Sequence, residues 1–108
     1  MYDPELYLNT LNNVVEDHPD FYFTIGDDFS IERLIERNTI SQAAVDSVYM
    51  IQRPYLGIIG KFSPLYLVNG NHEQAAQYLL NGTPDNAAVF AAKARTKFYS
   101  LPAPDGFY

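Results

Sequence analysis

Two short apolar runs, set far apart in the chain, constrain the fold more than any other feature. Phe21–Ile25 and Leu65–Val68 are rich in aromatic and aliphatic residues, and each is followed within two residues by a glycine. Runs of this kind are typical of buried strands. The segment between them has helical periodicity. Two strands joined by helices predict an α/β fold with a parallel pair, one βαβ crossover and both faces of the sheet covered.

The flanking helices have recognisable start and stop signals. Asp3 followed by Pro4 predicts an N-cap and a first helical residue, and His18-Pro19 ends that helix. Between the strands, Ser30 is expected to cap a short helix. Thr39, with Gln42 three residues later, predicts the capping box of a longer one. Its predicted apolar positions are Val45, Val48, Ile51, Tyr55 and Ile59.

Residues that typically interrupt, end or begin helices predict three further features. Pro54 should kink the longer helix or start a new one. After the second strand, Gln74–Leu80 predicts a short helix stopped by Asn81-Gly82. Thr83-Pro84 is expected to open the next helix, and the last ten residues, which are rich in proline, are predicted to be irregular.

Composition excludes several classes of function. The chain has 108 residues, a net charge of −6 and only seven Lys and Arg residues, so no basic surface for a nucleic-acid backbone can be assembled. It has no cysteine, which excludes disulfides and thiol nucleophiles. No apolar run reaches the length of a membrane span, and the first ten residues do not form a signal peptide. We therefore expect a soluble protein of unknown compartment.

Polar residues follow both predicted strands. Asp27 comes directly after Gly26, and Asn71 and His72 come directly after Gly70. Because the carboxyl ends of parallel strands meet at one edge of a sheet, we expect these side chains to lie side by side. Such a mixed oxygen and nitrogen set suits a first-row divalent metal.

Each of these residues also has a purely structural interpretation. Asp27 could cap a turn, Asn71 could be a left-handed turn residue, and Glu73 could be a first-turn acid that complements a helix dipole. We interpret Asp28 as a turn residue or cap. The pairing of Asp27 with the sequence Gly-Asn-His-Glu favours a functional interpretation for the other three.

At these residues the chain resembles the calcineurin-like metallophosphoesterases. That family has the motifs D-x-H, G-D-x-x-D, G-N-H-D/E, a lone His and G-H-x-H. Gly26–Ser30 is similar to the second motif and Gly70–Glu73 to the third, each after a predicted strand. The flanking sequences also resemble one bacterial branch of the family, so the resemblance covers nearly the whole chain. It implies part of the metallophosphoesterase sandwich.

The resemblance implies roles for four residues. Asp27 would bridge two divalent metal ions, of Mn, Fe or Zn, and Asn71 would bind one of them. His72 would act at the leaving oxygen of a phosphate-ester substrate, and Glu73 would orient His72. The implied activity is hydrolysis of a phosphomonoester or phosphodiester.

The chain also departs from the family pattern. It has no D-x-H motif, and its two histidines leave no lone His and no G-H-x-H motif; Ser30 stands where the second motif ends in Asp. We therefore expect one incomplete domain over residues 1–108, inactive alone and active as part of an intact protein. The alternative is a non-catalytic α/β binding or assembly domain derived from the family, which could self-associate through an exposed sheet edge.

Overall fold

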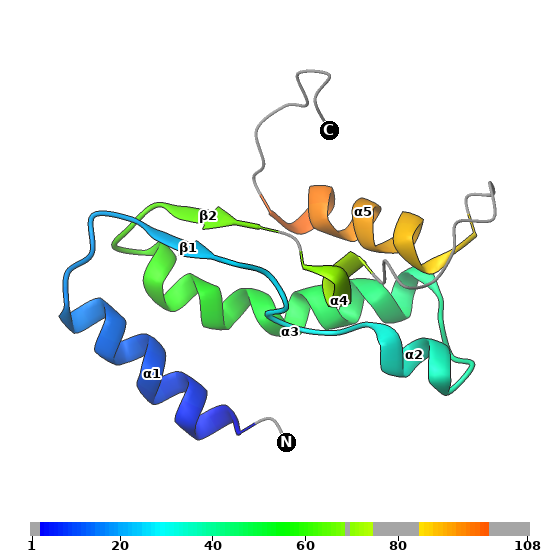
Figure 1. The fold of residues 1–108 in the computed structure, drawn as a ribbon, viewed down its shortest axis with the longest axis horizontal. Coiled ribbons are helices and arrows are strands. Elements are labelled where there is room, and N and C mark those ends of the chain that lie inside the picture. The colour runs from blue at the N-terminus through cyan, green and yellow to red at the C-terminus, as the bar shows by residue number, and fades with distance from the viewer. Residues whose placement is uncertain (1–2, 69, 75–84, 100–108) are drawn as a thin grey trace.

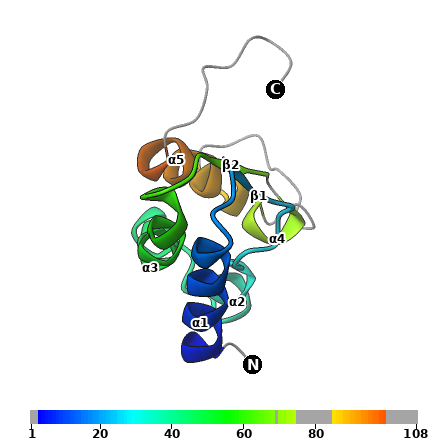
Figure 2. The same ribbon diagram turned by 90° about the vertical axis from the view of Figure 1, so that its left-hand side faces the viewer.

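A long central helix organises the fold. The computed structural model describes residues 3–68, 70–74 and 85–99. Its elements, in chain order, are α1 (Pro4–Glu16), β1 (Tyr22–Thr24), α2 (Glu32–Glu36), α3 (Gln42–Gly60), β2 (Leu65–Leu67), α4 (Asn71–Gln74) and α5 (Ala87–Phe98). The strands lie above α3, α1 packs below its C-terminal half and α5 packs above its N-terminal half (Figure 1). Figure 2 shows the same order end-on. The α/β class is confirmed in this coarse form, with helix predominating.

The two strands form a parallel pair, as the sequence predicts. Tyr22 is the partner of Leu65, and Thr24 is the partner of Leu67. The Tyr22 amide donates to the Pro64 carbonyl oxygen at 2.9 Å. Since α2 and α3 connect the strands, this is the expected βαβ crossover, and both strands point toward the same end of the molecule.

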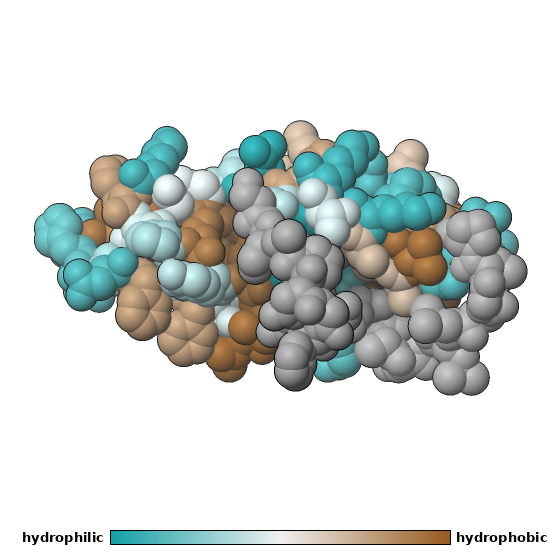
Figure 3. All heavy atoms as spheres, turned by 90° about the horizontal axis from the view of Figure 1, so that it is seen from above, coloured by the Kyte–Doolittle hydropathy of each residue, from teal (hydrophilic) through white to brown (hydrophobic). Residues whose placement is uncertain are grey.

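The prediction that both faces of the sheet are covered is wrong. On the inner face Thr24 is buried, whereas the outer face is open to solvent. Five apolar side chains on that face are half-exposed or more: Phe21, Phe23, Ile25, Tyr66 and Val68. Figure 3 shows apolar side chains at the surface over the half of the molecule that holds the sheet. The apolar runs are continuous because both of their faces are apolar, but the described chain covers only one.

Helix capping follows the sequence closely, with two corrections. The N-cap of α2 is Ile31 and not the predicted Ser30, although the Ser30 hydroxyl accepts from the Glu32 amide at 3.2 Å. The Asp3 carboxylate accepts from the amides of Glu5 and Leu6 at 3.0 and 3.1 Å, which confirms the predicted start of α1. The cap of α3 is Ser41, which accepts from the Ala44 amide at 3.1 Å, and not Thr39. Ser and Thr are both good caps, so the choice depends on which residue is extended where the helix begins.

The buried stripe of α3 also differs from the predicted one. It consists of Val45, Tyr49, Gln52, Leu56 and Ile59, with alternating spacings of four and three residues. The predicted positions Val45 and Ile59 belong to it, but Ile51 is 65 % exposed. The helix continues through Pro54, which lies within it. The sequence contains two overlapping apolar stripes here, and packing buries the one that contains Tyr49.

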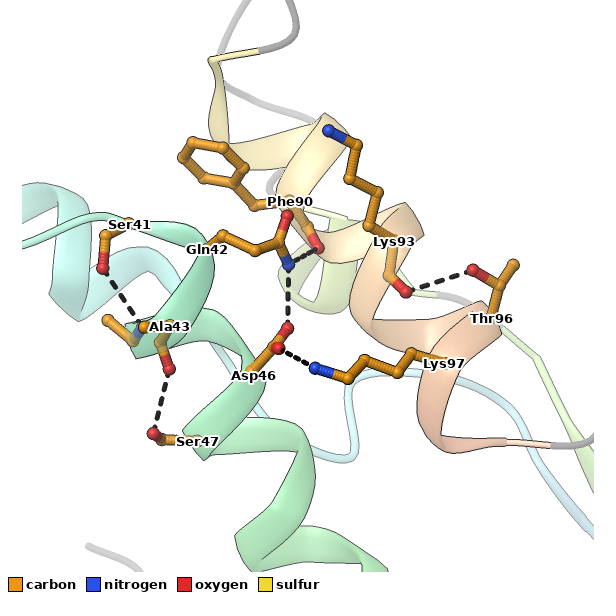
Figure 4. A network of polar contacts seen from close by, with 10 residues as sticks. Ser41, Gln42, Ala43, Asp46, Ser47, Phe90, Lys93, Thr96 and Lys97 are labelled. Carbon is orange, nitrogen blue, oxygen red and sulfur yellow. Dashed lines mark hydrogen bonds and ion pairs between the residues drawn. The ribbon is translucent and has the colours of Figure 1, made fainter.

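The main core lies between α3 and α5. Its fully buried members are Ile31, Val45, Tyr49, Ala91 and Ala94. Beside the core, Gln42 donates to the Asp46 carboxylate at 2.8 Å and to the Phe90 carbonyl oxygen at 3.0 Å (Figure 4). Lys97 reaches the same carboxylate at 2.7 Å, and this hydrogen bond lowers the pKa of Asp46. The small alanine side chains of α5 let this helix approach α3 closely. The polar contacts of Gln42, Asp46 and Lys97 then fix how the two helices align.

The remaining predicted elements lie partly outside the described residues. This applies to most of Gln74–Leu80, to Thr83-Pro84 and to the proline-rich end. Among the described residues, a four-residue helix already begins at Asn71, and α5 begins after Asn86, whose side chain accepts from the Val89 amide at 3.0 Å. None of the helices in the described part of the chain is long and apolar enough to cross a membrane.

Candidate functional site

The loop after β1 turns sharply through two residues with left-handed backbone. Gly26 has φ 91° and Asp27 has φ 60°. Glycine adopts this conformation freely, whereas for aspartate it is uncommon and costs about 1 kcal/mol or more. The exposed side chain of Asp27 then accepts a hydrogen bond from the backbone amide of His72, at 3.1 Å from Oδ1. Asp27 therefore lies where this loop meets the loop that follows β2, as the sequence predicts.

Gly70 allows the two loops to touch. A Cβ atom at this position would lie 2.0 Å from Oδ1 of Asp27 and 2.5 Å from its backbone nitrogen. No side chain fits in that space. The glycine of the Gly-Asn-His-Glu sequence is therefore required here by the close approach of Asp27.

Glu73 ties the two loops together. Its carboxylate is 1 % exposed. Oε2 accepts from the amides of Asp27 and Gly70, both at 2.9 Å. Oε1 accepts from the Asp28 amide and, at 3.4 Å, from the Phe29 amide. One buried carboxylate thus organises four backbone amides from the ends of both strands.

The carboxylate that contacts the imidazole of His72 is therefore not Glu73, the expected one. Glu32, in the first turn of α2, places Oε2 2.8 Å from Nδ1 of His72. The Glu32 side chain is 12 % exposed, whereas the imidazole is 41 % exposed. At this distance the carboxylate favours a proton on Nδ1, although Nδ1 has no hydrogen-bond geometry to an acceptor among the described residues. Nε2 is then the nitrogen left for a ligand.

Sequence reasoning missed Glu32, although a signal was present. The family motif ends in Asp at the position of Ser30, and a carboxylate follows two residues later. The short helix α2 carries that carboxylate back toward His72. The prediction that Glu73 orients His72 is replaced by this contact, because Glu73 is occupied by amides.

Asp28 is more than a turn residue. Its side chain is half-buried, and burial raises its pKa above the ordinary value of 3.8. The nearby negative charge of Glu73 raises the pKa further, and Arg95 opposes the shift. Asp28 thus adds a carboxyl group whose charged form is disfavoured next to the exposed Asp27.

The described residues supply only part of a metal site. Asp27 and Asn71 are exposed at the edge where the two loops meet, so both can offer an oxygen ligand. In the described ranges, however, no group of three or more His, Asp or Glu side chains is placed to hold a metal ion. Two such oxygens fit one side of a divalent-metal site, and a binuclear centre needs ligands beyond them.

The fold and site together define a helix-rich α/β chain with a joined pair of loops at the carboxyl edge of a parallel strand pair. No protein-family model, curated protein or solved structure matches this chain.

Proposed function

We propose that this chain contributes part of the active site of a metal-dependent phosphoesterase. In this proposal Asp27 and Asn71 are metal ligands, and His72, positioned by Glu32, acts at the leaving oxygen of a phosphate ester. The remaining ligands of a two-metal centre lie outside the described residues. The metal ions, when bound, would neutralise the phosphate and supply an activated water.

One observation carries the proposal: Asp27 and the segment Gly70–Glu73 behave as a single unit. Oε2 of Glu73 accepts from the amides of Asp27 and Gly70 at the same distance of 2.9 Å. The His72 amide donates to the Asp27 carboxylate in the opposite direction. These reciprocal contacts hold the Asp27 carboxylate beside His72, as a site that uses both groups requires.

Metal binding to the chain itself provides the test. Mn²⁺ added to the ¹⁵N-labelled chain should broaden the amide signals of Asp27 and Asn71 first, because the ion is paramagnetic. Asp27→Asn should remove this selective broadening. Asp20→Asn is the matched control, since Asp20 is an exposed aspartate before β1. Equal broadening in wild type and Asp27→Asn would refute the metal-ligand assignment.

The catalytic role of His72 is tested in a protein that carries a complete ligand set. His72→Ala should lower turnover of both p-nitrophenyl phosphate and its bis ester by about 100-fold or more, the usual range for a general acid. Glu32→Gln should lower turnover less and shift its pH profile. Unchanged rates in His72→Ala would exclude the leaving-group role.

A second candidate function is a non-catalytic assembly domain, and the open sheet face favours it. Phe21 contacts the rings of Phe23 and Tyr66, with centroids 6.3 and 6.2 Å apart. Clustered exposed aromatic side chains are typical of interaction surfaces. Under this alternative, sedimentation velocity should show a stable oligomer. Phe23→Lys should dissociate it, whereas Leu6→Lys, at another exposed apolar position, should not.

A further inference from the structure

A cavity of about 470 Å³ opens beside the joined loops, between α2 and α3. Its volume lies in the range of pockets that hold small molecules. Asp27 and His72 line one part of it, and Val48 and Ile51 line another. The cavity therefore connects the candidate site to the surface of α3.

The α3 part of the cavity offers an apolar wall that the core does not use. Ile51 is 65 % exposed because it lies off the buried stripe of α3. Val48 is half-buried and, with Phe29, joins Ile51 in lining the cavity. An exposed isoleucine at the wall of a cavity gains from contact with an apolar group of a ligand.

The polar part offers two donors for an anion. Arg33, on α2, lines the cavity, and among the described residues none bonds with its guanidinium group. His72 contributes Nε2, since Nδ1 faces Glu32, and Nε2 donates to an anion when both ring nitrogens carry a proton. Arg33 presents planar donors that suit phosphate oxygens. Asp27 and Asp28 line the same cavity, so a phosphate group requires a cation at Asp27 to offset their charge.

We propose that this cavity receives the organic part of a phosphate ester and selects for an aryl or branched alkyl group. The apolar group contacts Ile51 and Val48, while the phosphate lies between Arg33 and His72. The identification of the ligand as a phosphate ester depends on the proposed function. The preference for an apolar group depends on the wall that Ile51 forms.

Two non-hydrolysable probes test this proposal on the chain as it stands. Phenylphosphonate and methylphosphonate are titrated in the presence of Zn²⁺, with binding followed by NMR of the isoleucine and valine methyl groups. Phenylphosphonate should bind on the order of tenfold more tightly, the usual discrimination of an apolar pocket, and should shift the Ile51 methyl signals. Equal affinity for the two probes, or no binding of either, overturns the proposal.

Matched variants assign the effect to the two parts of the cavity. Ile51→Asn should abolish the preference for phenylphosphonate without changing methylphosphonate affinity. The control Met50→Asn, at an exposed neighbour outside the cavity lining, should keep the preference. Arg33→Ala should weaken both probes equally, whereas Arg37→Ala should weaken neither. Identical behaviour of Ile51→Asn and Met50→Asn overturns the proposal.

The same titration separates this inference from the proposed function. If phenylphosphonate shifts Ile51 and binding depends on both Zn²⁺ and Asp27, both are supported. If binding at Ile51 is unchanged by Zn²⁺ removal and by Asp27→Asn, the apolar selectivity of the cavity is supported and the phosphoesterase assignment is overturned.

Discussion

Replacing Glu73 by glutamine should separate the two loops of the candidate site. A carboxylate has about four acceptor positions, and Glu73 uses all of them on backbone amides. Glutamine keeps one oxygen, so at most two of the four amides retain an acceptor. The other two would face an NH₂ group, which is itself a donor.

The individual contacts set the size of the expected loss of stability. If the glutamine oxygen faces the amides of Asp27 and Gly70, both of which lie at 2.9 Å, the amides of Asp28 and Phe29 lose their acceptor. The Phe29 contact is long at 3.4 Å, so most of the loss comes from Asp28. One hydrogen bond to a charged group contributes about 1.5–3 kcal/mol. The two retained bonds become neutral and about half as strong. The free energy of unfolding should fall by about 3–6 kcal/mol.

Urea denaturation followed by circular dichroism measures this loss. Glu36→Gln is the control, because Glu36 is an exposed glutamate at the end of α2, and it should change the free energy of unfolding by less than about 0.5 kcal/mol. In the wild-type chain, hydrogen exchange should also show protected amides at Asp27 and Gly70. If Glu73→Gln and Glu36→Gln unfold at the same urea concentration, the four amide contacts do not hold the loops together.

Four further substitutions give distinct expectations. Gly70→Ala should lower the free energy of unfolding by about 1–3 kcal/mol, because its Cβ atom would overlap Asp27, and Gly57→Ala, with no atom within 4 Å, should raise it by about 0.5–1 kcal/mol in urea titrations. Burial raises the pKa of Asp28 above its ordinary value of 3.8, so its contribution to stability is present below that value and is lost as the pH rises through the raised one; Asp28→Asn should flatten the stability profile on the alkaline side of 3.8. Burial also raises the pKa of Tyr99 to about 12, so stability should fall as the pH rises from 10 toward 12, and a Tyr99→Phe variant should lose less in thermal melts across that range. A Gly57→Ala variant as unstable as Gly70→Ala, or unchanged pH profiles in the other two variants, would contradict these expectations.

The sequence predicts the parts of this fold that depend on local chemistry. Asp3 followed by Pro4 specifies the start of α1, and the two apolar runs specify a parallel pair. The offset stripe of α3 could not be predicted, because Ile51 and Tyr49 are both apolar and only the position of α5 decides which one is buried. The exposed sheet face was also unpredictable. A continuous apolar run shows that both faces of the strand are apolar, but it does not show what covers each face.

For the candidate site, too, the sequence predicts which residues lie together but not which side chain contacts which group. The pattern correctly predicts that Asp27 and His72 lie together, because parallel strands end at one edge. It cannot predict which carboxylate serves which group. Glu73 is adjacent to His72 in sequence, which made it the expected partner, yet side chains at successive helical positions point in different directions. The imidazole is reached by Glu32 from another helix.

Glu73 and Glu32 contact different groups, so the loss of one would affect the site differently from the loss of the other. Because Glu73 is fully occupied by amides, its loss would dismantle both loops whether or not the site is catalytic. Glu32 contacts the imidazole from the first turn of a five-residue helix, so its loss would release the contact that orients His72. A purely structural loop pair needs Glu73 and Gly70, whereas Glu32 accepts none of the four amide hydrogen bonds that join the loops. The presence of a nearly buried carboxylate on a half-exposed imidazole is therefore the feature that argues most directly for chemistry at His72.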